Sequence, residues 1–226
     1  MIVVLVCVFL CQFLDNPRKK VKEENNKKVG GTKPQDSKNR VLEFSCLSFR
    51  TKDFRNFKIG TLHGNAISDK GMALFPRKIN NKYVITSRQD SENIFIMLSD
   101  NIYYWNDAKI IKSLDQPWEY IQVGNCGSPI ETNKGWILIT HAVGPMRKYV
   151  ISAVLLDLEN PSKVIGSLTD PLIEPNEEER EGYTPNVVYS CGSLVHRNNL
   201  IKPYAFSDSA CGFASIKIPE LLKKFK

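Results

Sequence analysis

Histidine, methionine and tryptophan are scarce in this sequence, and several motifs that signal a known chemistry are missing. The 226 residues include 3 His, 4 Met and 3 Trp. No two cysteines are separated by two residues and no histidines follow at zinc-finger spacing, which excludes a zinc-finger module. A P-loop, a GxGxxG glycine motif, an HExxH motif and a nucleophile elbow are also absent. The sequence therefore carries no signal for nucleotide binding, zinc proteolysis or serine hydrolysis.

A long apolar segment is also missing. Residues 1–14 are apolar except for Gln12, but a membrane-spanning helix needs about 20 residues. The length suits the apolar part of a signal peptide, yet no basic residue precedes it and no small-residue cleavage site follows. Three interpretations of this segment stay open. It is a short uncleaved membrane anchor, a poor signal peptide, or an N-terminal start that is unrelated to the rest of the fold. We expect a cytoplasmic domain, or a secreted or membrane-anchored one if this segment is a real signal.

The excess of positive charge lies near the N-terminus. The net charge is +7, and residues 1–40 hold nine Lys or Arg against four Asp or Glu, whereas residues 41–226 hold 22 against 20. Because the second part is nearly neutral, we expect no nucleic-acid partner. Residues 15–40 are rich in Lys and Asn and have no apolar periodicity, so we interpret them as a basic, disordered linker.

Residues 41–226 have the pattern of an all-β domain. Runs of about five to eight residues, rich in Val, Ile, Tyr and Phe, are bounded by turn residues, and no long segment has a helical period. From Pro219 onward we expect a turn or two of helix. The predicted strands are Lys82–Ser87, Asn93–Leu98, Gly135–Thr140, Tyr149–Leu156, Asn186–Ser190, Ser193–His196, Leu200–Phe206 and Gly212–Ile218.

A faint repeat favours a β-propeller. A turn, a strand with Tyr or Trp near its start, and a second strand ending in Asp recur at Lys82, Gly135 and Leu200, at intervals of 53 and 65 residues. Four short strands in each unit of about 50 residues are typical of a propeller blade, and a β-sandwich is the alternative. The domain then holds about three to four blades, which is short for a closed propeller.

Several polar side chains follow the ends of predicted strands, where ligand sites often lie. Each has a structural alternative: a histidine satisfied within the core, arginines in ion pairs between blades, a solvated acidic face at residues 177–181, or an aspartate capping a turn. The six cysteines are interpreted as free thiols, although the sequence does not exclude a disulfide between any two. The candidates for binding are Lys70, Arg77, Arg88, Gln122, His141 and Asp208.

Six segments, in order, resemble glycoside hydrolase family 130, which comprises β-mannoside phosphorylases and β-mannosidases. The resemblance covers the chain from about Asp53 to Phe213. It implies a five-bladed β-propeller, of which this chain is an incomplete example. The segments are 69–77 (DKGMALFPR), 87–90 (SRQD), 118–132 (WEYIQVGNCGSPIET), 135–141 (GWILITH), 155–161 (LLDLENP) and 179–192 (EREGYTPNVVYSCG).

The resemblance implies inverting chemistry on a β-mannoside. An aspartic acid protonates the leaving-group oxygen, and either phosphate or water attacks the anomeric carbon from the opposite face. The family needs no metal or other cofactor, and inorganic phosphate is the co-substrate of its phosphorylases. We therefore expect a β-mannoside oligosaccharide or glycan as the ligand.

The resemblance also implies roles for individual residues. His141 falls where the phosphorylases place a phosphate-contacting histidine, and Asp208 falls where the family has a sugar-contacting aspartate. Gln122 replaces a lysine of the phosphorylases, and because its amide is neutral this departure favours the hydrolases. Lys70, Arg77 and Arg88 belong to motifs that line the cleft.

The family's acid aspartate, in a Glu-Asp-x-Arg context of the first blade, has no counterpart in residues 1–45. Asp15 stands in a superficially similar context, which we do not accept. The catalytic residues are thus unknown, with Glu131 and Glu181 as candidates for activating water. Three readings stay open: a truncated or divergent glycosidase-related enzyme, a non-catalytic carbohydrate-binding remnant, and a phosphorylase completed by a partner chain, for instance in a homo-oligomer.

Overall fold

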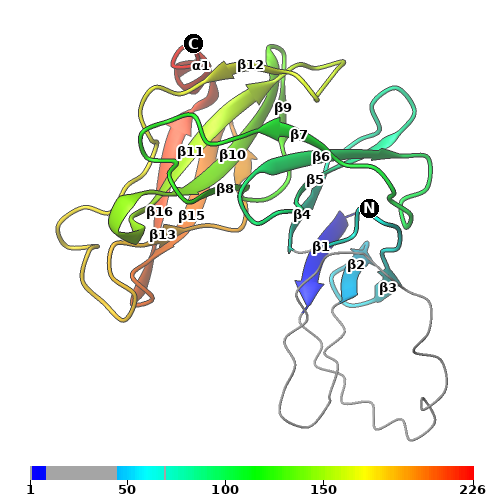
Figure 1. The fold of residues 1–226 in the computed structure, drawn as a ribbon, viewed down its shortest axis with the longest axis horizontal. Helices are drawn as coiled ribbons and strands as arrows, with labels where there is room; N and C mark the ends of the chain where they lie inside the picture. The colour runs from blue at the N-terminus through cyan, green and yellow to red at the C-terminus, as the bar shows by residue number, and fades with distance from the viewer. Residues whose placement is uncertain (1, 9–44, 69) are drawn as a thin grey trace, which may run out of the picture.

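A computed structural model of the chain describes residues 2–8, 45–68 and 70–226 (Figure 1). The linker expected at residues 15–40 lies outside these residues. The described part consists of sixteen strands, one short 3-10 turn and one short helix, which confirms the all-β prediction. No helix within it is long and apolar enough to cross a membrane.

The strands form four antiparallel sheets that follow one another along the chain (Figure 1). Sheet 1 contains β1 (Ile2–Val8), β2 (Ser45–Thr51) and β3 (Phe57–Thr61). Sheet 2 contains β4 (Lys70–Leu74), β5 (Tyr83–Arg88), β6 (Ile94–Ser99) and β7 (Lys109–Lys112). Sheet 3 contains β8 (Gln122–Asn125), β9 (Ile130–Thr132), β10 (Gly135–Val143), β11 (Tyr149–Leu156) and β12 (Val164–Ser167). Sheet 4 contains β13 (Val188–Tyr189), β14 (Leu194–His196), β15 (Asn199–Phe206) and β16 (Ala210–Lys217).

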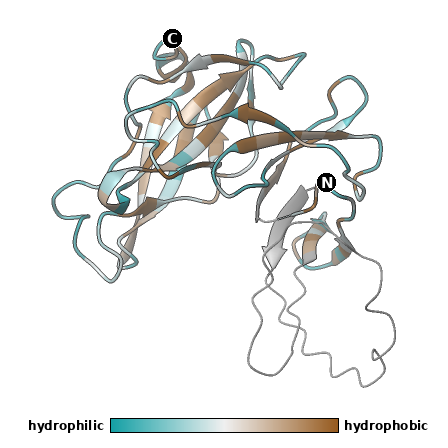
Figure 2. Ribbon diagram, in the orientation of Figure 1, coloured by the Kyte–Doolittle hydropathy of each residue, from teal (hydrophilic) through white to brown (hydrophobic). Residues whose placement is uncertain are grey.

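Strand β10 belongs to the hydrophobic cores on both faces of sheet 3. All nine of its residues are buried, and eight of them, residues 136–143, pair with β11. Successive side chains of a strand point to opposite faces of the sheet, so Trp136 and Leu138 face one neighbouring sheet while Ile137 and Ile139 face the other. Figure 2 shows hydrophobic residues along β10 and β11 and hydrophilic ones in many of the loops.

Each pair of successive sheets shares a hydrophobic core. Between sheets 3 and 4 the core contains Ile137, Ile151 and Leu200. The core between sheets 2 and 3 includes Val84, Ile96, Trp136 and Leu138, and the one between sheets 1 and 2 includes Leu62, Ile85, Met97 and Trp105. Burying one Leu or Ile side chain stabilises a fold by about 1.5–3 kcal/mol. Sheets 2 and 3 therefore each pack against a neighbouring sheet on both of their faces, as neighbouring blades of a propeller do.

Most predicted strands of residues 82–217 are confirmed as β5, β6, β10, β11, β15 and β16. The helix expected from Pro219 is α1 (Ile218–Leu222), with this proline in its first turn. The pairing of β1 with β2, which sets Cys7 opposite Cys46, was not anticipated. The boundary at residue 14 and a signal or anchor role for residues 1–14 stay predictions, as does the number of blades.

Candidate functional site

Arg88 and His141 meet at the boundary between sheets 2 and 3. Arg88 is the last residue of β5, His141 lies near the end of β10, and both are buried. Nη1 of Arg88 lies 3.4 Å from Nε2 of His141. A guanidinium only donates hydrogen bonds, so Nε2 is the acceptor and the imidazole proton belongs on Nδ1. That nitrogen lies 3.7 Å from the sulfur of Cys126.

Two glycines make room for this pair. Gly124 lies directly opposite His141 in the pairing of β8 with β10. A Cβ atom at Gly124 would lie 2.5 Å from Cε1 of His141 and 3.4 Å from Cδ of Arg88. A Cβ atom added at Gly71, which has φ +79°, would lie 3.5 Å from the Cβ atom of Arg88. Any larger side chain at position 124 would therefore displace the imidazole.

Buried polar atoms beside the pair lack hydrogen-bond partners. They are Nε of Arg88 and Oδ1 of Asn125. In the described part of the chain, Arg88 also forms no ion pair with an acidic residue. A buried cation without a counter-charge is costly, and each unsatisfied buried group calls for an explanation such as a bound ion or a catalytic role. The guanidinium of Arg88 can donate to an anion, whereas Oδ1 of Asn125 requires a donor such as a hydroxyl group.

The surroundings of His141 keep several neighbouring groups uncharged. The ring of Tyr189 contacts the imidazole edge-on, with the ring centroids 5.4 Å apart. Burial raises the pKa of Tyr189, and burial also raises the pKa of the Cys126 thiol to about 11. Both groups are therefore protonated at neutral pH. Burial lowers the pKa of Lys202, which interacts electrostatically with Cys126.

Two further predicted site residues lie close to the pair in the strand register. Gln122 stands opposite Val143, two residues along β8 from Gly124, so its side chain lies on the same face as that of His141. Lys70 pairs with Arg88 across β4 and β5. The roles of Lys70 and Gln122 in binding stay predictions.

Arg77 and Glu131 bind each other away from His141. Nε and Nη2 of Arg77 donate to Oε1 of Glu131 at 2.9 and 2.6 Å, and the guanidinium lies 4.9 Å from the ring centre of Trp136. The hydrogen bond lowers the pKa of Glu131 and raises that of Arg77. Glu131 pairs with Trp136, about 17 Å along β10 from His141 at 3.4 Å per residue. The structure does not bring these two residues to the Arg88 site.

Asp208 and the segment 176–187 form a third group. Asp208 is in the tight turn between β15 and β16 at φ 53°, and its Oδ2 accepts a hydrogen bond from Thr184 at 2.5 Å. Glu181 is exposed. Its neighbour Glu179 is buried and accepts hydrogen bonds from the hydroxyl of Tyr204 at 2.7 Å and the backbone N–H of Asn176 at 3.2 Å. Contact of Asp208 with a sugar stays a prediction.

The candidate list from the sequence did not include four residues of these groups. Asn125, Cys126, Glu179 and Tyr189 all lie inside the segments at 118–132 and 179–192 that carry the family resemblance. Their position inside these segments was the signal in the sequence that could have identified them as site residues. Their burial and contacts, however, arise only when sheets 2, 3 and 4 pack together.

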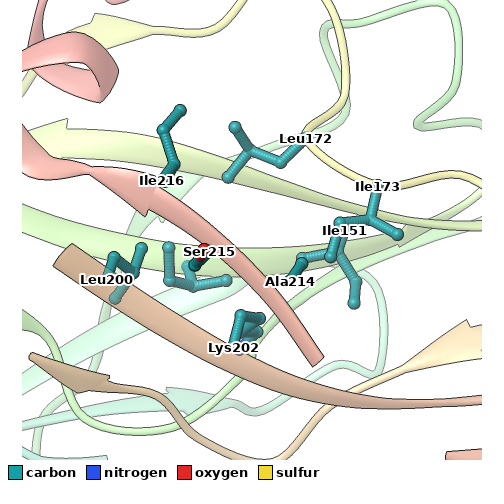
Figure 3. Close-up of a pocket in the computed structure, with 9 residues that line it drawn as sticks. Ile151, Leu172, Ile173, Leu200, Lys202, Ala214, Ser215 and Ile216 are labelled. Carbon is teal, nitrogen blue, oxygen red and sulfur yellow. The ribbon is translucent and has the colours of Figure 1, made fainter. Parts of the chain in front are cut away.

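An apolar cavity of about 170 Å³ separates β10 and β11 from β15 and β16 (Figure 3). Ile139, Ile151 and Leu200 are among its lining residues, and Lys202 supplies the charged group. A sugar needs many hydrogen-bond partners for its hydroxyls, so this cavity does not suit a mannoside. A wider groove of about 830 Å³ is lined by Glu131, Lys134 and other residues of sheets 3 and 4.

The part of the chain that the structure describes holds no cluster of three or more His, Cys, Asp or Glu that could bind a metal ion. The contacts described above build the candidate site from Arg88, His141, Asn125 and Tyr189. Its chemistry is that of hydrogen bonding and positive charge.

Comparisons with known proteins agree with the family resemblance seen in the sequence. The sequence model of glycoside hydrolase family 130, described as beta-1,4-mannooligosaccharide phosphorylase, matches residues 39–226. A 1,2-beta-oligomannan phosphorylase of Thermoanaerobacter sp. (strain X514) is 43% identical over 155 residues, covering 68% of this chain and 52% of that protein. A beta-1,2-mannobiose phosphorylase of Listeria innocua is 31% identical over 186 residues, covering 78% of this chain and 51% of the relative.

The solved structure of one of these phosphorylases is also similar to the structure of this chain. The beta-1,2-mannobiose phosphorylase from Listeria innocua, in complex with beta-1,2-mannobiose, superposes with a TM-score of 0.70 and 30% identity, over 81% of this chain and 53% of that one. The chain thus spans about half the length of the curated relatives that it matches. The chain belongs to glycoside hydrolase family 130.

Proposed function

We propose that this chain forms the phosphate- and mannoside-binding part of a β-mannoside phosphorylase. The observation that carries the proposal is the buried guanidinium of Arg88, which contacts His141 and lacks both an acidic partner among the described residues and a partner for its Nε. The relatives above are phosphorylases of β-mannosides, which supports the same class of reaction here. We also propose that the four sheets are blades of the family's five-bladed propeller.

In this proposal Arg88 and His141 hold the attacking phosphate. Arg88 offers its N–H groups to phosphate oxygens, a charge-assisted contact that guanidinium geometry favours. Once Arg88 turns its N–H groups toward the phosphate oxygens, Nε2 of His141 is released from its contact with Nη1 and accepts a hydrogen bond from the P–O–H of a phosphate monoanion. The phosphate is then positioned to attack the anomeric carbon, while a carboxylic acid protonates the leaving oxygen from the other face.

Two features of this chain would limit catalytic turnover of a mannoside even when phosphate is bound. Gln122 supplies a neutral amide where the family's phosphorylases have a lysine, and one charge-assisted hydrogen bond is worth about 1.5–3 kcal/mol. We assign no general acid among the described residues, and such an acid typically contributes about 10²–10⁴-fold to the rate. These features favour a second candidate function, binding of mannosides without phosphorolysis by this chain alone.

Calorimetric titration with inorganic phosphate tests the proposal. Arg88→Met should lower the phosphate affinity by about 10-fold or more. Arg77→Met is the matched control, because Arg77 already has Glu131 as its partner, and the affinity should be unchanged. Equal phosphate affinities for the wild type and a folded Arg88→Met variant would overturn the assignment.

A parallel assay measures release of mannose 1-phosphate or mannose from β-1,2-mannobiose. Phosphate binding without product supports a site that depends on an acid from elsewhere. Release of mannose 1-phosphate by this chain supports the complete phosphorylase. Binding of mannobiose that neither requires nor influences phosphate binding favours the second candidate function.

A further inference from the structure

Cys126 and Cys191 lie in two segments outside the strands, one directly after β8 of sheet 3 and the other between β13 and β14 of sheet 4, and these segments contact each other. The Cβ of a residue at position 127, next to Cys126, would be 2.8 Å from the carbonyl oxygen of Cys191 and 3.0 Å from Cα of Gly192. The backbone N–H of Ser190 donates a hydrogen bond to the thiol of Cys126. The two segments are therefore in backbone contact at the two cysteines.

The two thiols differ in exposure. Cys191 is exposed, whereas Cys126 is buried, and both are free. Cys191 is in the irregular segment between β13 and β14, which is free of the ladder hydrogen bonds that hold a strand. A disulfide requires the two Cα atoms to lie roughly 4.4–6.8 Å apart, so a disulfide between Cys126 and Cys191 requires this segment to adopt that spacing. An exposed thiol next to a buried one is the arrangement of an attacking and a resolving cysteine.

Lys202 adds a positive charge at this place. Its Nζ donates a hydrogen bond to the carbonyl of Gly192 at 3.1 Å, and its ammonium interacts electrostatically with both Cys126 and Cys191. Among the described residues it has no ion pair with a carboxylate. For Cys126, burial outweighs this charge and raises the pKa of the thiol to about 11, so we assign Cys126 to the second step of the reaction.

We propose that Cys126 and Cys191 form an oxidative modification site that reacts with low-molecular-weight disulfides such as oxidised glutathione. The Cys191 thiolate attacks one sulfur of the reagent, forms a mixed disulfide and releases the first thiolate. Cys126 loses its proton to water and attacks the sulfur of Cys191, which releases the second thiolate. The two protein thiols lose two protons and two electrons, and the reagent disulfide is reduced to two thiols.

A disulfide at Cys126 would affect the candidate site because Cys126 contacts His141. The sulfur of Cys126 lies 3.7 Å from Nδ1 of the imidazole, so bonding of that sulfur to Cys191 removes the neighbour that faces the Nδ1 proton. The oxidised and reduced proteins should therefore differ in the position of His141. This consequence depends on the disulfide alone and holds whether or not the site binds phosphate.

Peptide mapping by mass spectrometry after incubation with oxidised glutathione tests the proposal. In the wild type we expect a cross-linked pair of peptides containing Cys126 and Cys191, with the loss of two hydrogens. Cys211 is the internal control, because it is also an exposed free thiol but is not placed beside Cys126. Cys211 should retain a glutathione adduct.

Variants separate the two steps. In Cys126→Ser, Cys191 should retain the glutathione adduct, and in Cys191→Ser, Cys126 should stay reduced. Cys211→Ser should leave the cross-link unchanged. A stable glutathione adduct at Cys191 of the wild type, or a cross-link of Cys191 to Cys211 in place of Cys126, would overturn the proposal.

Discussion

Nη1 of Arg88 lies 3.4 Å from Nε2 of His141, although the two residues are 53 positions apart in the sequence and belong to different sheets. The contact forms where the edge strand β8 of sheet 3 approaches β4 and β5 of sheet 2. Gly71 and Gly124 flank it, one from each sheet. The candidate site is therefore a property of the boundary between two sheets.

Replacing Gly124 by Ala should disrupt the site. The new Cβ atom would lie 2.5 Å from Cε1 of His141, and such overpacking costs about 1–3 kcal/mol. Urea unfolding should show this loss, and phosphate affinity should fall because His141 is displaced. Gly192→Ala is the control, since nothing lies within 4 Å of its Cβ position. Equal stability of both variants would contradict the close fit at Gly124.

Glu131→Gln should change stability in a pH-dependent way. Arg77 lowers the pKa of Glu131 from its usual 4.5. The ion pair therefore contributes fully to the free energy of unfolding above pH 4.5, and this contribution is lost as the pH falls through the lowered pKa. Because both side chains are partly exposed, the loss in the variant should stay below about 1 kcal/mol at pH 7. Unfolding curves of the two proteins should converge in acid, and a difference that persists there would refute the ion-pair explanation.

Glu179 and Glu181 should differ sharply when each is replaced by Ala. Removing the carboxylate of Glu179 leaves the hydroxyl of Tyr204 and the N–H of Asn176 without their acceptor, which costs about 1–3 kcal/mol for a buried group. Glu181 is exposed, and its replacement should change the free energy of unfolding by no more than about 0.5 kcal/mol. Urea titration measures both values. Similar losses at the two positions would show that segment 176–187 packs differently.

Lys202→Met should be neutral or up to about 1–4 kcal/mol stabilising at pH 7, as for other buried charges replaced by apolar groups. Gly192 is only partly buried, so water can replace Lys202 at its carbonyl. Burial lowers the pKa of Lys202 below 10.5, so between the two pKa values the unfolded wild type binds more protons and its stability rises with pH.

Unfolding measured at pH 7 and pH 10 checks the effect at Lys202. The advantage of Lys202→Met over the wild type should shrink at the higher pH. Lys217→Met serves as the control, since the side chain of Lys217 is 67% exposed, and it should show no such trend. A constant difference between Lys202→Met and the wild type at both pH values would mean that Lys202 does not carry a buried charge.

The sequence alone determined the all-β class, the positions of the long strands of residues 82–217 and the resemblance to the family. These features depend on local chemistry. The runs at Tyr83–Arg88, Gly135–Val143 and Tyr149–Leu156 are rich in β-branched and aromatic residues and are bounded by turn residues. The family motifs also contain Arg88 and His141, so both could be proposed as site residues before any contact was known.

Only the tertiary structure decided which of the candidates meet. Arg77 and Glu131 looked equivalent to Arg88 and His141 in the sequence, yet they bind each other near the opposite end of β10. Glu179 is buried and Glu181 exposed, although they are two residues apart. The physical reason is that strand register and sheet-to-sheet packing, set by contacts between residues far apart in the chain, determine which charged groups lose water and which find partners.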